Sequence, residues 1–300
     1  MIYQINHATP YPYVSGGLIS HNLAHLAARN YARQTCRRHE IWLSIPPAVL
    51  TEQTDDFGNP ATFFIVQEPH RELRIRASNE VWVHPRLAPS AWLTMPCNHV
   101  RDTLRTSRDA ATMDAYLFTF ESAYIPWEPA LADYAKESFP HGRPVLEGGV
   151  ELMGRLHDDF TFDPTLTTIA TPLGDVMAFR RGVCQDFAHL EIGCLRSLGL
   201  AARYVSGYSS TTPPVSQQRM IDAGASHAWV SVYCSWRGWT DVDPTNNVIP
   251  CHEHIVLVLG RDFDDVSPIK GVILGGGGHN LSVAVDVVRL DEGYDDVQSG

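Results

Sequence analysis

Residues 182–208 read GVCQDFAHLEIGCLRSLGLAARYVSGY, and their pattern indicates an α-helix that begins at a cysteine. Apolar side chains recur at the three- and four-residue spacing of one helix face, at Phe187, Leu190, Cys194 and Leu198. Gly199 follows the last of them, and glycine is suited to the C-terminal cap of a helix. The sequence therefore predicts that Cys184 opens a helix.

The first position of a helix suits a nucleophilic thiol. The positive end of the helix macrodipole and the unpaired backbone N–H groups favour a thiolate at Cys184, and they can stabilise an oxyanion beside the attacking sulfur. Gln185, in the first helical turn, is a candidate for lining the cleft or the oxyanion site. Cys194 falls within the apolar stripe and is predicted to belong to the core.

Residues 226–247 read SHAWVSVYCSWRGWTDVDPTNN and predict two antiparallel strands. His227 begins the first strand and Asp243 ends the second. Successive side chains of a strand point to opposite faces, so His227 and Asp243 meet only if their connection near Ser235 has an odd number of residues or a bulge. A tight two-residue turn would place them on opposite faces. The parity of this connection is therefore a test of the predicted pair.

With that geometry, Cys184, His227 and Asp243 form a candidate catalytic triad. Asp243 would accept a hydrogen bond from one imidazole nitrogen of His227 and fix its tautomer, while the other nitrogen exchanges a proton with the thiol. Cys184 would attack a carbonyl carbon and form a thioester, and His227 would pass a proton to the leaving amine. Trp229 is a candidate for lining the acyl site, with packing on the sheet as the alternative.

Cys251, His252, Glu253 and His254 are all residue types that bind zinc. Adjacent residues of an extended chain point alternately to opposite sides, so no more than two of these ligands converge without a bend. We therefore predict that the protein has no metal site, and the proposed thiol chemistry requires no cofactor.

Composition excludes several other classes of function. The chain has 300 residues and a formal net charge of -11, which argues against a nucleic-acid partner because phosphate binding normally needs a basic surface. Its N-terminus, MIYQINHATPYPYVSGG, has no basic start followed by an apolar run, and no stretch reaches the roughly 18 apolar residues of a membrane span. We expect a cytoplasmic protein that does not bind membranes, with its cysteines mostly reduced.

The first part of the chain is typical of an antiparallel β unit. Residues 2–83 contain short β-type runs separated by turn residues. Leu73, Ile75 and Ala77 alternate with polar residues, which is the period-two pattern of a strand with one buried face.

Short helical patterns follow this β unit, around residues 113–124, 130–138, 145–157 and 172–179. We therefore divide the chain into a β-rich domain over residues 1–95 and a second domain over residues 96–300. The second domain carries the candidate triad and is expected to include the C-terminal strands.

Several segments resemble bacterial transglutaminase-like proteins: GVCQDFAHL (182–190), RSLGLAARYVSGY (196–208), HAWVSVY (227–233) and GWTDVDPTN (238–246). The resemblance extends to HATPYPY (7–13), DDFGNP (55–60) and HIVLVLGRDFDDVSPIKGV (254–272), so it covers most of the chain and accounts for His254. It implies an α+β fold, with an N-terminal β-sandwich-like domain before a papain-like core in which the Cys184 helix packs on an antiparallel sheet bearing His227 and Asp243.

The resemblance and the triad together predict a cysteine protease or amidase that acts on a peptide or protein substrate. Transfer of the acyl group to an amine, as in a transglutaminase, is the alternative enzymatic outcome, because the same thioester serves both reactions. A non-catalytic binding module with the same fold is the alternative from another class, since fold alone does not establish activity.

Overall fold

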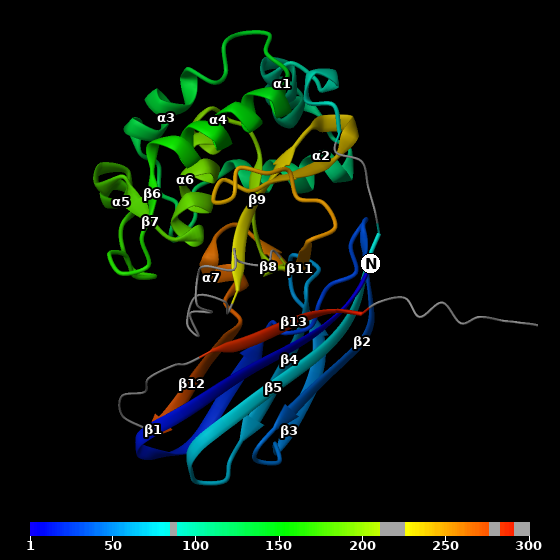
Figure 1. The fold of residues 1–300 in the computed structure, drawn as a ribbon, viewed down its shortest axis with the longest axis vertical. Coiled ribbons are helices and arrows are strands. Elements are labelled where there is room, and N and C mark those ends of the chain that lie inside the picture. Colours follow the sequence, from blue (N-terminus) through cyan, green and yellow to red (C-terminus); the bar gives the residue numbers. More distant parts are fainter. Residues whose placement is uncertain (85–88, 211–225, 276–282, 291–300) are drawn as a thin grey trace, which may run out of the picture.

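The computed structural model describes residues 1–84, 89–210, 226–275 and 283–290. These residues form a β-rich lobe and a second lobe that contains the helices (Figure 1). The fold is α+β, with a β-sandwich-like N-terminal domain before the core, which confirms the predicted fold class.

The β-rich lobe is built around the long strand β1 (Ile2–Ala24). Its first half pairs with β5 (His70–Val83) and β13 (Ala284–Leu290), and its second half pairs with β4 (Pro60–Val66) and β12 (Ile269–Gly275). The remaining strands are β2 (Gln34–Leu43), beside β5, and β3 (Val49–Thr54), beside β4. All of these pairs are antiparallel.

The alternating pattern of β5 confirms the strand predicted there. Leu73, Ile75 and Ala77 are buried, while Arg74 and Arg76 between them are exposed. The buried set packs in a core with residues of β1 and β4, and burial of such side chains stabilises the lobe by about 1.5–3 kcal/mol each.

The C-terminal strands differ from their predicted place. We expected them in the second domain, within residues 96–300, whereas β12 and β13 both pair with β1 in the first lobe. An unpaired side of a strand leaves a row of backbone N–H and C=O groups open. In the first half of β1, β13 pairs on the side that β5 leaves open, and in the second half β12 pairs on the side that β4 leaves open. The domain boundary at residue 95 stays a prediction.

The second lobe contains a four-stranded antiparallel sheet in the order β10-β9-β8-β11. Its strands are β8 (Ala202–Ser209), β9 (His227–Tyr233), β10 (Trp239–Val242) and β11 (His254–Gly260). A short parallel pair, β6 (Thr161–Phe162) and β7 (Arg181–Gly182), contacts helices α5 and α6 through β7. The helices are α1 (Cys97–Thr106), α2 (Ala110–Tyr116), α3 (Pro129–Lys136), α4 (Val145–Asp159), α5 (Leu173–Phe179), α6 (Cys184–Ser197) and α7 (Phe263–Val266), with 3-10 turns at Ala91–Leu93, Leu117–Thr119 and Ser235–Arg237.

Helix α6 is the central element of this lobe and packs against β8, β9 and α3 (Figure 1). Every residue from 186 to 196 is buried, as expected of a helix that other elements surround. The helix ends at Ser197, and Gly199 follows with φ of 73°, so the predicted glycine cap is confirmed. Within the described ranges, no helix is long and apolar enough to cross a membrane.

Two side-chain amides of the first lobe hold the second lobe at β11, an edge strand of its sheet. Gln34 donates to Val256 O (2.7 Å) and accepts from Val256 N (2.8 Å). Asn59 makes the same double contact with Leu259, at 2.7 and 2.8 Å. An amide offers a donor and an acceptor side by side, so each side chain replaces a missing strand neighbour. These bonds fix the edge from which His254 projects.

Candidate active site

The chain just before α6 is shaped by Asp186. Its Oδ2 atom accepts hydrogen bonds from Val183 N (2.8 Å) and Thr167 Oγ1 (2.7 Å), which ties the helix start to the preceding loop. A Cβ atom at Gly182 would lie 2.6 Å from the same oxygen, so only glycine allows this turn. Asp186 therefore positions the backbone around the half-buried Cys184, which is the first residue of α6.

The register of β9 and β10 confirms the predicted parity. Tyr233 pairs with Trp239, so the connection consists of residues 234 to 238, an odd number. This register places His227 and Asp243 on the same face of the sheet, where Nε2 of His227 lies 2.7 Å from Oδ2 of Asp243.

His227 also has the Cys184 thiol as a hydrogen-bond partner. Since Nε2 contacts Asp243, Nδ1 is the nitrogen left for the sulfur. Burial disfavours the charged form of His227, but hydrogen bonds to Asp243 and Cys184 outweigh it and raise the pKa of His227 to about 10. The structure thus brings together all three residues of the candidate triad in the predicted order, with an imidazole that readily holds a proton between sulfur and carboxylate.

Asp243 is fully buried, and donors surround its carboxylate. Oδ2 accepts from Nε2 of His227 (2.7 Å), Nε2 of His254 (2.9 Å) and Nδ2 of Asn246 (2.7 Å). Oδ1 accepts from the backbone N–H groups of Thr245 (3.0 Å) and Asn246 (3.2 Å). Burial favours the neutral acid, but the bonds from His227 and His254 outweigh it and hold the pKa of Asp243 well below its usual value.

His254 and Asn246 are the site residues that the sequence analysis missed. Asn246 lies in the turn directly after Asp243, where Asn side chains commonly bond to nearby groups. His254 is the first residue of the buried strand β11, just as His227 is the first residue of β9. A histidine at the start of an apolar strand is the sequence signal that could have indicated His254. Its neighbour His252 instead contacts Cys251 Sγ at 3.4 Å, so the sequence cluster at 251–254 does not converge on one point.

Trp229 lies below the site rather than in an open cleft. It is fully buried and packs with Val205, Val256 and Leu259. Its ring contacts those of His227 (5.8 Å between centroids) and His254 (5.1 Å, edge to face). The expectation that Trp229 lines the acyl site therefore differs from the structure, because Val205, Val256 and Leu259 cover its side chain on the face of β9 that it shares with His227. Gln185 is half-buried in the first turn of α6, and its role in the cleft stays a prediction.

Gly207 makes room for this packing. A Cβ atom there would lie 2.0 Å from the backbone oxygen of Ile255 and 2.6 Å from the Trp229 ring, and Gly207 pairs with His227 across β8 and β9.

We expect Gly207→Ala to lower the free energy of unfolding by about 3 kcal/mol, since the clash is with backbone as well as side chain. Urea denaturation measures this. Gly154→Ala in α4, where the Cβ meets nothing closer than 3.7 Å, is the control and should not destabilise the protein; equal effects of the two would contradict the packing argument.

Glu191 is a buried acid about two helical turns beyond Cys184, on the same side of α6. Its side chain is fully buried, and within the described residues neither carboxylate oxygen has a hydrogen-bond partner. Burial and the nearby charge of Asp243 raise the pKa of Glu191 well above its usual 4.5. The folded protein therefore keeps this group protonated at a pH where the unfolded chain has released the proton.

The protonation of Glu191 predicts a pH-dependent stability. Because its folded-state pKa is raised, stability is lost as pH rises above 4.5. Glu191→Gln, which is uncharged and similar in shape, should raise the free energy of unfolding at pH 8 by about 1–3 kcal/mol and by much less at pH 4.5. Urea denaturation at both pH values tests this, with the exposed Glu121→Gln as control. A gain that is equal at both pH values would refute the assignment.

Within the described residues, His227, Asp243 and His254 are the group whose geometry suits a metal ion, with ligand atoms within 4.8 Å of one another. Imidazole and carboxylate are suitable zinc ligands. Here, however, both Nε2 atoms bond directly to one carboxylate oxygen, so an ion would have to replace those hydrogen bonds. The predicted absence of a metal and of a cofactor stays a prediction.

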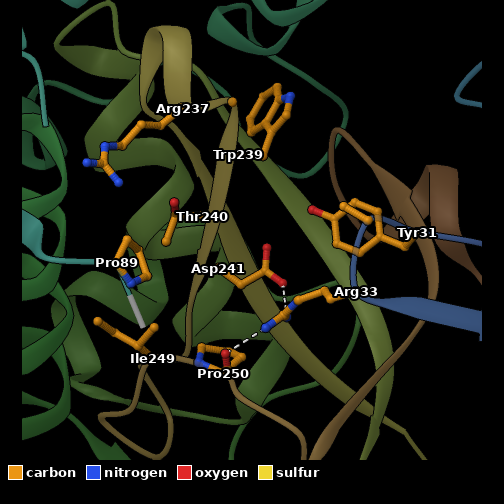
Figure 2. Close-up of a pocket in the computed structure, with 11 residues that line it drawn as sticks. Tyr31, Arg33, Pro89, Arg237, Trp239, Thr240, Asp241, Ile249 and Pro250 are labelled. Carbon is orange, nitrogen blue, oxygen red and sulfur yellow. Dashed lines mark hydrogen bonds and ion pairs between the residues drawn. The ribbon is translucent and has the colours of Figure 1, made fainter. Parts of the chain in front are cut away.

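A pocket of about 300 Å³ lies along β10, at the junction with the first lobe (Figure 2). Arg33 reaches into it, pairs with Asp241 and donates to Pro250 O at 2.6 Å. Figure 2 shows Trp239 and Arg237 at the opposite end of the same pocket. None of the residues that line it belongs to the candidate triad, so the candidate chemistry lies outside this pocket.

Comparison with known proteins assigns the family. Residues 133–244 match the transglutaminase-like superfamily, and residues 3–82 match the bacterial transglutaminase-like N-terminal region. An uncharacterized protein of Mycobacterium tuberculosis is 37% identical over 294 residues, which is 96% of this chain and 93% of the relative. The chain belongs to the bacterial transglutaminase-like family.

Other similarities agree with this family. An uncharacterized protein of Mycobacterium leprae is 31% identical over 288 residues, covering 96% of this chain and 98% of the relative. The crystal structure of a "Putative Cysteine Protease" from Cytophaga hutchinsonii aligns with a TM-score of 0.76 at 20% identity, over 97% of this chain and 91% of that protein. This transglutaminase-like protein therefore shares the fold of that structure across both lobes.

Proposed function

We propose that this transglutaminase-like protein is a cysteine-dependent enzyme that cleaves amide bonds in peptides or proteins through a thioester. The observation that carries the proposal is the continuous contact from Cys184 through His227 to the buried, ionised Asp243. Burying the Asp243 charge is unfavourable for folding. The arrangement nevertheless has what an activated thiol needs, a base beside the sulfur and a third group that orients the base.

In the first half of the reaction the Cys184 thiolate attacks the carbonyl carbon of the amide. The resulting oxyanion is stabilised by backbone N–H groups at the start of α6, which have no partners within the helix. His227 then gives its proton to the departing amine, the carbon–nitrogen bond breaks, and the acyl group stays on sulfur as a thioester. Asp243 keeps the imidazole oriented throughout.

In the second half, water attacks the thioester while His227 removes its proton, and the carboxylic acid leaves with Cys184 free again. Hydrolysis is our first proposal. Transamidation differs only in that an amine takes the place of water, so an assay that supplies both a peptide amide and a primary amine distinguishes them by product mass. A binding module of the same fold has no need of a reactive thiol, which makes thiol reactivity the decisive property.

The test is the rate of iodoacetamide labelling at each cysteine at pH 7, followed by peptide mass mapping. Cys184 is expected to label at least about tenfold faster than Cys251, an exposed thiol of the same chain, because His227 stabilises the thiolate. His227→Ala should remove this advantage while leaving Cys251 unchanged. Slow labelling of Cys184 that does not respond to His227→Ala would refute the proposed function and favour the binding module.

A further inference from the structure

His254 is joined to the candidate triad through Asp243. It begins β11, its side chain is buried, and its Nε2 atom lies 2.9 Å from Oδ2 of Asp243, the same atom that accepts from His227. It lies outside residues 133–244, the part of the chain that matches the transglutaminase-like core.

The hydrogen-bond pattern determines the form of the His254 ring. An ionised carboxylate only accepts, so Nε2 of His254 carries a proton and donates it to Asp243. Nδ1 is buried and has no partner within the described part of the chain, so a second proton there would be a buried donor without an acceptor. His254 therefore donates to Asp243 through Nε2, whereas His227 bonds to both Asp243 and Cys184.

His254 differs from the other donors to Asp243 in where it comes from. Thr245 and Asn246 belong to the turn that carries Asp243 and move with it. His254 projects from β11, which Gln34 and Asn59 hold against the first lobe. The edge-to-face contact with Trp229 (82° between ring planes) also restrains the ring. The bond from His254 thus ties the carboxylate to a rigid element outside its own turn.

We propose that His254 is a positioning residue, which holds the Asp243 carboxylate in the orientation that keeps His227 charged and aligned with Cys184. This inference rests on the proposed function. Two ionisable groups of α6 also act on this cluster: Cys184 bonds to His227, and the charge of Asp243 acts on Glu191, whose carboxylate has no hydrogen-bond partner among the described residues. Among the residues that the structure describes, the hydrogen bonds to Oδ2 from outside its own turn come from His227 and His254, so without His254 the carboxylate would depend on His227, the group that it has to position.

A matched pair of variants tests this role. The amide nitrogen of glutamine reaches the place of Nε2, whereas that of asparagine reaches only the place of Nδ1, so His254→Gln keeps the donor and His254→Asn loses it. We expect the rate of iodoacetamide labelling of Cys184 at pH 6.5 to fall about tenfold in His254→Asn, similar to the effect of removing a residue that orients a metal ligand. In His254→Gln the rate should stay within about threefold of that of the original protein. Near pH 10.5 the two variants should converge, because that pH lies above the usual cysteine pKa of about 8.5, so a partly exposed thiol no longer depends on His227 to lose its proton.

The controls separate this inference from the proposed function. His252→Gln, two residues earlier and partly exposed, should label as the original protein does, and melting curves establish that each variant is folded. If His227→Ala slows labelling but both His254 variants label normally, His254 has no positioning role and the proposed function stands. If His227→Ala has no effect, the proposed function itself fails. If His254→Asn does not fold, His254→Gln alone tests the role. A folded His254→Gln variant whose Cys184 labels tenfold more slowly than in the original protein would overturn the proposal, because this variant keeps the donor.

Discussion

Replacing Cys184 by alanine is expected to abolish amide cleavage, with a loss of at least about 10⁴-fold in kcat/KM, because no other group on the site can form the thioester. The fold should survive, since Cys184 is only half-buried and the helix start is held by Asp186 and Gly182 rather than by the thiol. The measurement is turnover of a peptide substrate found by screening, together with a melting curve.

Cys251→Ala is the matched control for the loss of a thiol. Cys251 is exposed and contacts His252, which is not a member of the triad, so its replacement should leave turnover within about twofold. Retained turnover in Cys184→Ala would exclude thioester chemistry. Loss of turnover in both variants would indicate instead that general thiol loss, and not the triad, is responsible.

Asp243→Asn is the second change with a large expected effect, and it should damage activity and stability together. The amide nitrogen has to replace either Oδ2, which accepts from His227 and His254, or Oδ1, which accepts from two backbone N–H groups. In either orientation at least one N–H group is left facing another. The hydrogen bond that raises the pKa of His227 to about 10 is lost, and His227 is expected to adopt the wrong tautomer. We expect kcat/KM to fall about 10³- to 10⁴-fold and the free energy of unfolding to fall by about 3–5 kcal/mol.

The pH dependence of this change follows from the shifted pKa values. The raised pKa of His227 contributes stability that is present below its usual value of 6.5 and is lost as pH rises towards about 10. The lowered pKa of Asp243 contributes stability that is present above 3.8 and is lost in stronger acid. The destabilisation by Asp243→Asn should therefore be largest between about pH 4 and 6.5 and should shrink above pH 10, as urea denaturation over this range will show.

Asp241→Asn is the matched control for Asp243→Asn. Asp241 is also buried and lies on β10, two residues before Asp243, but its partner is Arg33 of the first lobe. Its replacement should destabilise the protein while Cys184 still labels rapidly. If Asp241→Asn suppresses the labelling of Cys184 as strongly as Asp243→Asn does, the effect comes from general damage to β10 rather than from the triad.

Local patterns in the sequence were sufficient for much of the candidate site. The helix that begins at Cys184 and ends before Gly199 has its own period and cap, and both depend only on neighbours a few residues away. The shared face of His227 and Asp243 was predictable because an antiparallel pair with a short connection has few possible registers. The α+β fold followed from the same local patterns together with the family resemblance.

Other features depended on contacts between distant segments. The alternating C-terminal strands gave no sign of their partner, and pairing with β1 was decided by the free side of that strand. The face of β9 that carries Trp229 alternates correctly in the sequence, yet only the packing of Val205 and Val256 against it shows that this face is closed. Burial on both faces of a strand is a property of the assembled layers.

The sequence by itself predicted that Cys184 begins a helix and that His227 and Asp243 share a face of the sheet, because helix period, strand alternation and loop parity act over short distances. Only the tertiary structure decided that His254 shares the carboxylate with His227 and that Glu191 is buried with no hydrogen-bond partner among the described residues. The physical reason is that hydrogen bonding and desolvation depend on which atoms meet after folding, and residues far apart in the chain supply those atoms.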